Sequence, residues 1–156
     1  MKNYLVAVLF VLASCNGQKK ASMKDSSSGS KPANSKMVLL VQDEYGGFDV
    51  EETMIIKDEK RLKSLYAKIN RTRKPGLPLP IIDFSKEMVI FHCVGEQNFD
   101  GLPVLTFNAE TEKQVILNSD MHRDSKENLT SIRTNLFCIY KIPITKKEVL
   151  VERNFK

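Results

Sequence analysis

The hydrophobic and polar positions along the chain divide it into three parts. Residues 5–13 are apolar and uncharged, residues 16–36 contain no aromatic residue, and residues 37–156 alternate short apolar runs with polar ones. The first run is at most half of the ~20 apolar residues that a membrane-spanning helix needs, so it predicts a signal peptide over residues 1–14. The third part has the usual size of a single domain.

The first half of this domain predicts strands followed by a helix. Apolar and β-branched runs at 37–41 and 48–56, separated by turn-forming residues at 43–47, predict a hairpin. From Asp58, a suitable N-cap, the apolar positions recur at intervals of three and four residues, which predicts an amphipathic helix. Its apolar stripe consists of Leu62, Leu65, Tyr66 and Ile69. The basic residues of 71–74 then predict a solvated last turn, or a docking patch for an acidic partner, before a proline-rich connector.

The second half predicts further strands. Residues 88–94 are apolar on both faces of a strand, which is typical of a strand in the middle of a structure. Runs at 104–107 and 114–118 flank a turn and predict a meander, and runs at 136–143 and 148–152 complete the domain. The sum is an α+β fold: an antiparallel, β-rich domain, built as a meander or a small sandwich-like or barrel-like sheet, with one main amphipathic helix.

The junction between the first two parts carries a processing motif. Leu12-Ala13-Ser14-Cys15 places an aliphatic residue and two small residues before a cysteine, and it resembles the lipobox of bacterial lipoproteins. The resemblance implies that Cys15 is the first mature residue, with a diacylglyceryl group on its thiol and an acyl chain such as palmitate on its new amino end. Two or more acyl chains anchor a protein stably. We therefore expect a lipid-anchored protein of the bacterial cell envelope, at the outer membrane if the cell is Gram-negative; an ordinary secreted protein is the alternative.

The second part explains the charge of the chain. Residues 16–36 are rich in Ser, Gly, Lys and Asn, which predicts a disordered basic tether after the lipidated cysteine. The net charge of +5 comes from this tether and Lys2, because residues 37–156 hold 18 basic and 18 acidic groups. A nucleic-acid-binding domain carries its positive charge on the fold itself. The pattern therefore excludes nucleic acid as a partner and favours a membrane surface.

A second resemblance covers residues 83–143. The stretch 83–90, the glycines Gly95 and Gly101, and the stretch 137–143 are similar to the C-terminal domain of the PrcB family, named for a lipoprotein subunit of a bacterial surface protease complex. The chain departs from the family pattern at three positions: Asp100, Leu102 and Leu136. The resemblance implies a β-rich accessory subunit, and its motifs contain no catalytic residue. Gly95, Asp100 and Gly101 form its candidate interaction loop.

The titratable residues offer little for catalysis. His92 lies in the apolar run 88–94, which predicts a hydrogen-bonded core imidazole. His122 stands between Asp120 and Asp124, but zinc takes three or four ligands and calcium six to eight. We predict no catalytic residue, no metal site and no cofactor.

The cysteines of the domain leave two alternatives open. Cys93 and Cys138 fall in predicted strands, and an oxidising envelope permits a disulfide between them. Buried free thiols, which behave as small hydrophobic side chains, are the favoured interpretation.

These observations lead to one main hypothesis and two alternatives. The main hypothesis is a membrane-anchored, non-catalytic binding or accessory subunit, which contacts another envelope or secreted protein through a sheet edge or loops. The resemblance to the PrcB family implies a protease as a candidate partner. The first alternative is a carrier of a small apolar ligand. The second is a hydrolase that uses His122 and Asp124.

Overall fold

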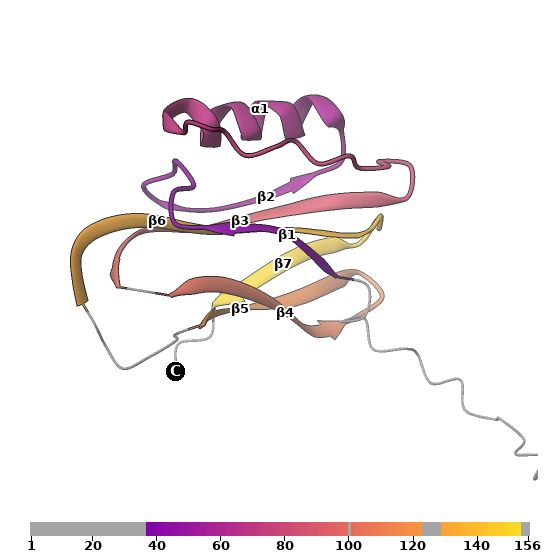
Figure 1. The fold of residues 1–156 in the computed structure, drawn as a ribbon. Helices are drawn as coiled ribbons and strands as arrows, with labels where there is room; N and C mark the ends of the chain where they lie inside the picture. The colour runs from indigo at the N-terminus through magenta and orange to yellow at the C-terminus, as the bar shows by residue number, and fades with distance from the viewer. Residues whose placement is uncertain (1–36, 100, 123–128, 154–156) are drawn as a thin grey trace, which may run out of the picture.

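The computed structural model describes residues 37–99, 101–122 and 129–153. These residues form three layers, shown in Figure 1: a helix, a four-stranded sheet beneath it, and a three-stranded sheet beneath that. The arrangement confirms the predicted α+β class, with a β-rich domain and one main helix.

The four-stranded sheet is antiparallel throughout. Its strands follow one another in the order β1 (Val38–Asp43), β6 (Leu129–Pro143), β3 (Glu87–Phe99) and β2 (Glu51–Ile56). The long strands β3 and β6 therefore occupy the centre, and β1 and β2 are the two edges.

The three-stranded sheet is mixed. β4 (Leu102–Glu110) and β5 (Gln114–His122) form the antiparallel pair that the meander predicts, whereas β7 (Glu148–Arg153) pairs parallel with β5. The parallel pair was not predicted. It arises because β6 lies between β5 and β7 in the sequence but belongs to the other sheet, so the chain returns to the start of β5 before β7 begins.

The predicted hairpin between the first two strands is wrong. β1 and β2 lie at opposite edges of the four-stranded sheet, with β6 and β3 between them. The intervening turn passes across β6, since the Gly46 N–H donates to the Asn135 carbonyl at 2.7 Å and the Asn135 N–H donates to the Glu44 carbonyl at 2.9 Å. Local turn signals cannot show this, because the strands that separate β1 from β2 come later in the sequence.

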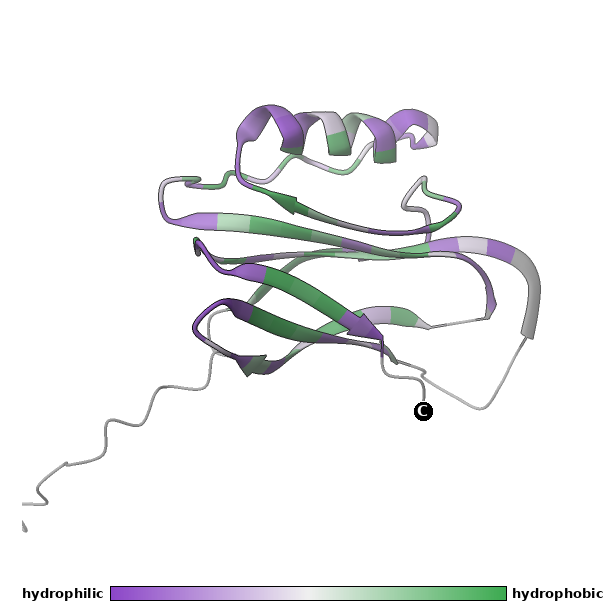
Figure 2. Cartoon of the chain, turned by 180° about the vertical axis from the view of Figure 1, so that it is seen from behind, coloured by the Kyte–Doolittle hydropathy of each residue, from purple (hydrophilic) through white to green (hydrophobic). Residues whose placement is uncertain are grey.

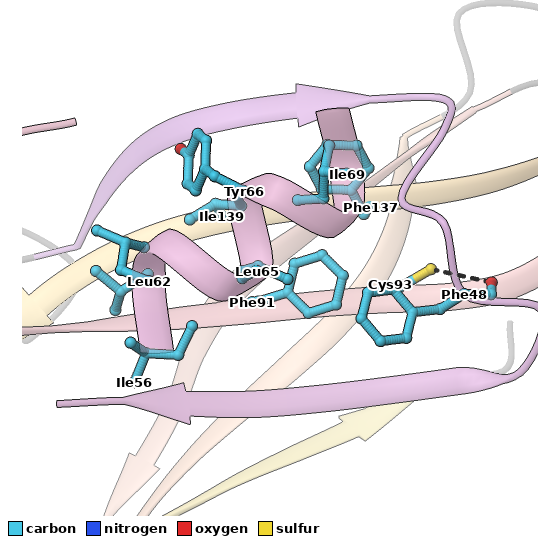
Figure 3. Packing of buried hydrophobic residues seen from close by; sticks show 11 residues of the cluster. Phe48, Ile56, Leu62, Leu65, Tyr66, Ile69, Phe91, Cys93, Phe137 and Ile139 are labelled. Carbon is cyan, nitrogen blue, oxygen red and sulfur yellow. Dashed lines mark hydrogen bonds between the residues drawn. The ribbon is translucent and has the colours of Figure 1, made fainter. Parts of the chain in front are cut away.

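The predicted amphipathic helix is confirmed as α1 (Glu59–Ile69). The side chain of Asp58 accepts a hydrogen bond from the Arg61 N–H at 2.8 Å and so caps the helix. The four predicted apolar residues are buried and point at β3, β6 and β2, as Figure 3 shows. A short 3-10 turn, η2 (Asn70–Thr72), follows before the proline-rich connector.

The alternation of side chains along β3 produces two hydrophobic cores. Val89, Phe91 and Cys93 face α1, while Met88 and Ile90 face the three-stranded sheet. Both faces are covered, so the middle of β3 is apolar at successive positions, whereas α1 alternates apolar and polar patches (Figure 2). The predicted central strand is confirmed, because β3 pairs with β2 and β6 and contributes side chains to both cores.

Candidate functional site

His92 occupies the interior between the two sheets. Its Nδ1 lies 2.9 Å from Thr53 Oγ1 on β2, and its Nε2 lies 2.8 Å from Ser119 Oγ on β5. Burial lowers the pKa of His92 to about 4, and the positive charge of Arg153 acts in the same direction. The prediction of a hydrogen-bonded core imidazole is confirmed.

Ser119 and His92 are as close as a catalytic nucleophile and its base, but the site lacks the access to substrate and the third group that such a pair needs. Ser119 is only 2 % exposed and His92 is fully buried, so a substrate carbonyl cannot approach the hydroxyl. The other ring nitrogen meets the neutral hydroxyl of Thr53, whereas a catalytic triad places a carboxylate or amide there. The three side chains therefore act as a hydrogen-bonded link between the sheets.

The second histidine region is described only in part. His122 is the last residue of β5, and Asp124 lies outside the described residues. Asp120 accepts a hydrogen bond from Thr106 Oγ1 at 3.4 Å. Within residues 37–99, 101–122 and 129–153, no three His, Cys, Asp or Glu side chains are grouped so as to hold a metal ion.

Cys93 and Cys138 are both buried, free thiols. Cys93 lies opposite Phe137 and faces α1, whereas Cys138 lies opposite His92 and faces the other sheet. Burial raises the pKa of both thiols. A disulfide between them would require β3 and β6 to slip by one residue, because such a slip is what moves a side chain to the other face of a sheet.

Gly95, the first residue of the candidate interaction loop, lies in a strand and not in a loop. Gly95 lies within β3 at a break in register with β6, has a φ of +76°, and is buried. A Cβ at this position would approach the Glu51 nitrogen to 2.8 Å, so glycine is required by close packing of β3 on β2. Gly101 directly precedes β4, and Asp100 lies outside the described residues.

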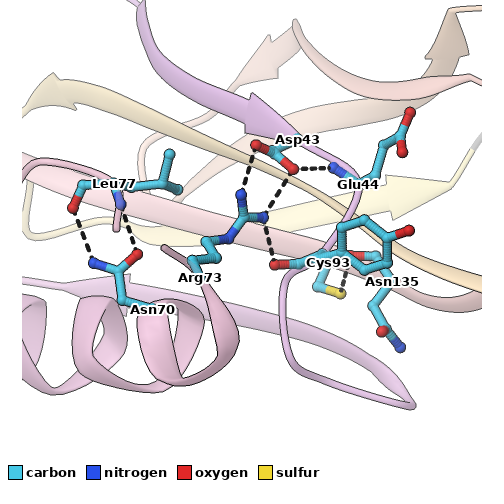
Figure 4. Close-up of polar contacts among 8 residues, drawn as sticks. Asp43, Glu44, Asn70, Arg73, Leu77, Cys93 and Asn135 are labelled. Carbon is cyan, nitrogen blue, oxygen red and sulfur yellow. Dashed lines mark hydrogen bonds and ion pairs between the residues drawn. The ribbon is translucent and has the colours of Figure 1, made fainter. Parts of the chain in front are cut away.

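The basic residues after α1 do not form a single exposed patch. Arg71 and Lys74 are exposed, as predicted. Arg73 instead points inward and forms two hydrogen bonds to the Asp43 carboxylate, at 2.8 and 2.9 Å, and one to the Tyr45 carbonyl at 2.8 Å (Figure 4). The guanidinium holds the pKa of Asp43 below its usual value. Arg73 therefore fastens the connector to β1.

β2 is one of the four edge strands of the two described sheets. Among the described residues β2 pairs with β3 alone. In an antiparallel sheet, alternate residues of an edge strand direct their N–H and C=O groups away from the partner. Such a row is a template for another extended chain.

A groove of about 780 Å³ lies between this edge and α1. Its apolar lining includes Phe48, Met54, Ile56 and Leu65. The helix contributes Lys60, Arg61, Ser64 and Lys68, and the β2 side contributes Glu52, Ile55 and Asp58. The groove therefore combines an apolar floor, a basic wall and a row of backbone hydrogen-bonding groups.

The charges of the groove are only partly paired. Arg61 Nε lies 3.6 Å from Asp58 Oδ2, and Lys68 Nζ lies 3.3 Å from the centre of the Phe48 ring. Within the described part of the chain, Lys60 has no carboxylate partner. An acidic side chain on an incoming strand would complement this wall.

Sequence reasoning did not predict the groove. Its walls are formed by β2 and α1, and the hydrophobic pattern of each element does not show how the two pack against each other. The signal that was present is the alternation of Glu52, Met54 and Ile56 on the β2 face that looks toward the helix.

A second, smaller pocket lies at one end of the two sheets. It measures about 200 Å³, and its lining includes Met37, Phe107, Leu117 and Ile142. Sites for small ligands usually have volumes of about 300–1,000 Å³. This pocket gives no specific support to a carrier of an apolar ligand.

Comparison of the chain with protein-family models, with curated proteins and with solved structures gives no match. In the described residues, no helix combines the length and the apolar character needed to cross a membrane.

Proposed function

We propose that the protein is a membrane-anchored envelope lipoprotein whose domain acts as a non-catalytic binding or accessory subunit of a protein complex. The observation that carries the proposal is the free edge of β2 beside an apolar, basic-walled groove. The lipobox at residues 12–15 and the PrcB-like pattern at 83–143 support the membrane location and the accessory role.

The site suits the addition of a strand. In this mode of recognition, main-chain hydrogen bonds to a free edge supply affinity, and pockets for alternate side chains supply specificity. Glu52, Met54 and Ile56 face the groove, so every second residue of an added strand would face it too. The partner contributes an extended segment, without a catalytic step.

The proposed anchor places this site near a membrane. Lipid on Cys15 would hold the chain, and residues 16–36 would act as a tether with a reach of ~25 Å. The basic residues of the tether add attraction to anionic lipid. The domain would then meet partners that are themselves in the envelope.

Affinity capture of the full chain from detergent-solubilised membranes tests the binding role. Met54→Lys adds a further positive charge to the basic groove and should abolish recovery of the partner. Val38→Lys makes the same kind of change on β1, the opposite edge of the same sheet, and should leave recovery unchanged. Repeated captures that recover no partner, or a partner retained equally by Met54→Lys, would contradict the proposed function.

A further inference from the structure

We infer, on the basis of the binding site proposed above, that the strand which occupies the β2 edge is β2 of a second copy of this chain. The two copies would be related by a two-fold axis normal to the four-stranded sheet. Each copy would present the same surface to the other, which is the usual form of a symmetric dimer. The two sheets would join into one.

The outer edge of β2 is open to pairing with another strand, because no bulge or proline interrupts it. Edge strands usually avoid such pairing by bulges, prolines or charges that point inward. The pairing of β1 contains a register break, and β4 contains both a break and Pro103. The six consecutive pairs between β2 and β3 contain no break, and β2 contains no proline. The same holds for β7 and its six pairs with β5, so the charge pattern of β2 and the groove beside it distinguish this edge.

The sequence of β2 is complementary to itself in one antiparallel register. A two-fold axis normal to the sheet leaves every side chain on the same face of the sheet. Because directly opposed residues of an antiparallel pair share a face, one residue of β2 must lie opposite its own copy. With Met54 at the axis, Glu51 lies opposite Lys57 of the second copy, and by symmetry the pair occurs twice. Opposite charges at facing positions stabilise a strand pair.

The neighbouring registers are less favourable. With Ile55 at the axis, Glu52 would face Asp58 of the second copy, which places like charges together. With Thr53 at the axis, Glu51 and Glu52 would lie opposite Ile55 and Met54. The charge pattern therefore selects Met54.

The two side chains of this ion pair are placed to form it. Glu51 and Lys57 lie on the face of the sheet that looks toward β7, where Glu51 is 3.4 Å from Arg153 and Lys57 Nζ donates to the Thr145 carbonyl at 3.3 Å. The Glu51 side chain is 45 % exposed, so it can accept a second cation. Lys57 is exposed and directly follows β2.

The same register fills the groove. Glu52 of the second copy would lie beside Ile56, at the end where α1 begins and where Lys60 and Arg61 line the wall. Met54 of the second copy would lie against Met54, over the apolar floor. Figure 3 shows that α1 starts beside Ile56 and crosses the sheet toward Ile69 and Phe137, so only its first turn, which includes Lys60 and Arg61, lies at this end of the added strand.

Cysteine cross-linking in membranes tests the register directly. In the full chain, Met54→Cys places a thiol opposite its own symmetry mate, and mild oxidation should give a dimer on a non-reducing gel. Glu52→Cys is the matched control, because it lies on the same face two residues away but opposite Ile56. Its two copies would be ~13 Å apart along the strands, too far for a disulfide.

Charge reversal tests the ion pair. Purified full chain in neutral detergent should show a reversible monomer–dimer equilibrium by sedimentation, in a concentration series that extends to ~1 mM so that weak association is detected. Lys57→Glu and Glu51→Lys should each weaken self-association by about tenfold or more, because each places like charges together. An equimolar mixture of the two variants should associate again, because all facing charges are then opposite.

The results separate this inference from the proposed function. A monomer at every concentration, cross-linking of Glu52→Cys that equals or exceeds that of Met54→Cys, or a mixture that fails to associate although both variants keep the wild-type circular dichroism, would overturn the inference. Capture of a different protein that depends on Met54 would then leave the proposed function standing. Loss of both results would remove both.

Discussion

His92 joins the two sheets through hydrogen bonds to Thr53 and Ser119, and it does so as a neutral ring. A protonated imidazole would carry a positive charge in a buried space, where the positive charge of Arg153 already disfavours it. The folded state therefore resists protonation of this residue more than the unfolded chain does.

This difference predicts a loss of stability in mild acid. The pKa of His92 falls from 6.5 to about 4 on folding, so its stabilising contribution is complete above pH ~6.5 and is lost as the pH falls toward 4. The full shift corresponds to roughly 3 kcal/mol of unfolding free energy. Urea unfolding at pH 7.5 and 4.5 should show this loss, and His92→Gln should show a smaller one. Equal pH dependence in the two proteins would contradict the role given to His92.

Residues differ in how far the sequence alone predicts their roles. His92 was predictable because its apolar neighbours at every second position define its face of β3. The inward position of Arg73 was not, because its partner Asp43 lies 30 residues away and the basic run 71–74 looks uniformly solvated. Pairings over such distances depend on the tertiary structure.

Among the elements, α1 was the most predictable. Its apolar stripe and its N-cap are local features, and both are present in the structure. The β1–β2 hairpin failed because strand pairing depends on which strands lie between, and the parallel β5–β7 pair was missed for the same reason. The groove depends on such pairing, since it exists only where β2 is an edge.

The N-cap of α1 gives a prediction at this scale. Asp58→Ala removes the acceptor for the Arg61 N–H and should reduce the free energy of unfolding by about 1 kcal/mol. Asp58→Asn keeps an acceptor at the same position and should lose less. Chemical denaturation of the three proteins measures the difference, and an equal loss in both variants would show that capping is not the cause.

At the scale of the whole molecule, the domain has a core on each side of the four-stranded sheet and, at β2, an uninterrupted edge strand beside a groove. Its acidic and basic residues balance, and the positive excess lies before residue 37. Such a molecule is suited to hold another protein segment near a membrane. The proposed anchor on Cys15 decides whether it does so there.

Metabolic labelling with palmitate, followed by membrane fractionation, determines whether Cys15 carries the lipid anchor. The wild-type full chain should carry the label and sediment with membranes. Cys15→Ala should lose both properties, while Cys93→Ala, which removes a buried cysteine of the domain, should keep them. Label that persists on Cys15→Ala, or a wild-type chain without label, would contradict lipid anchoring through Cys15.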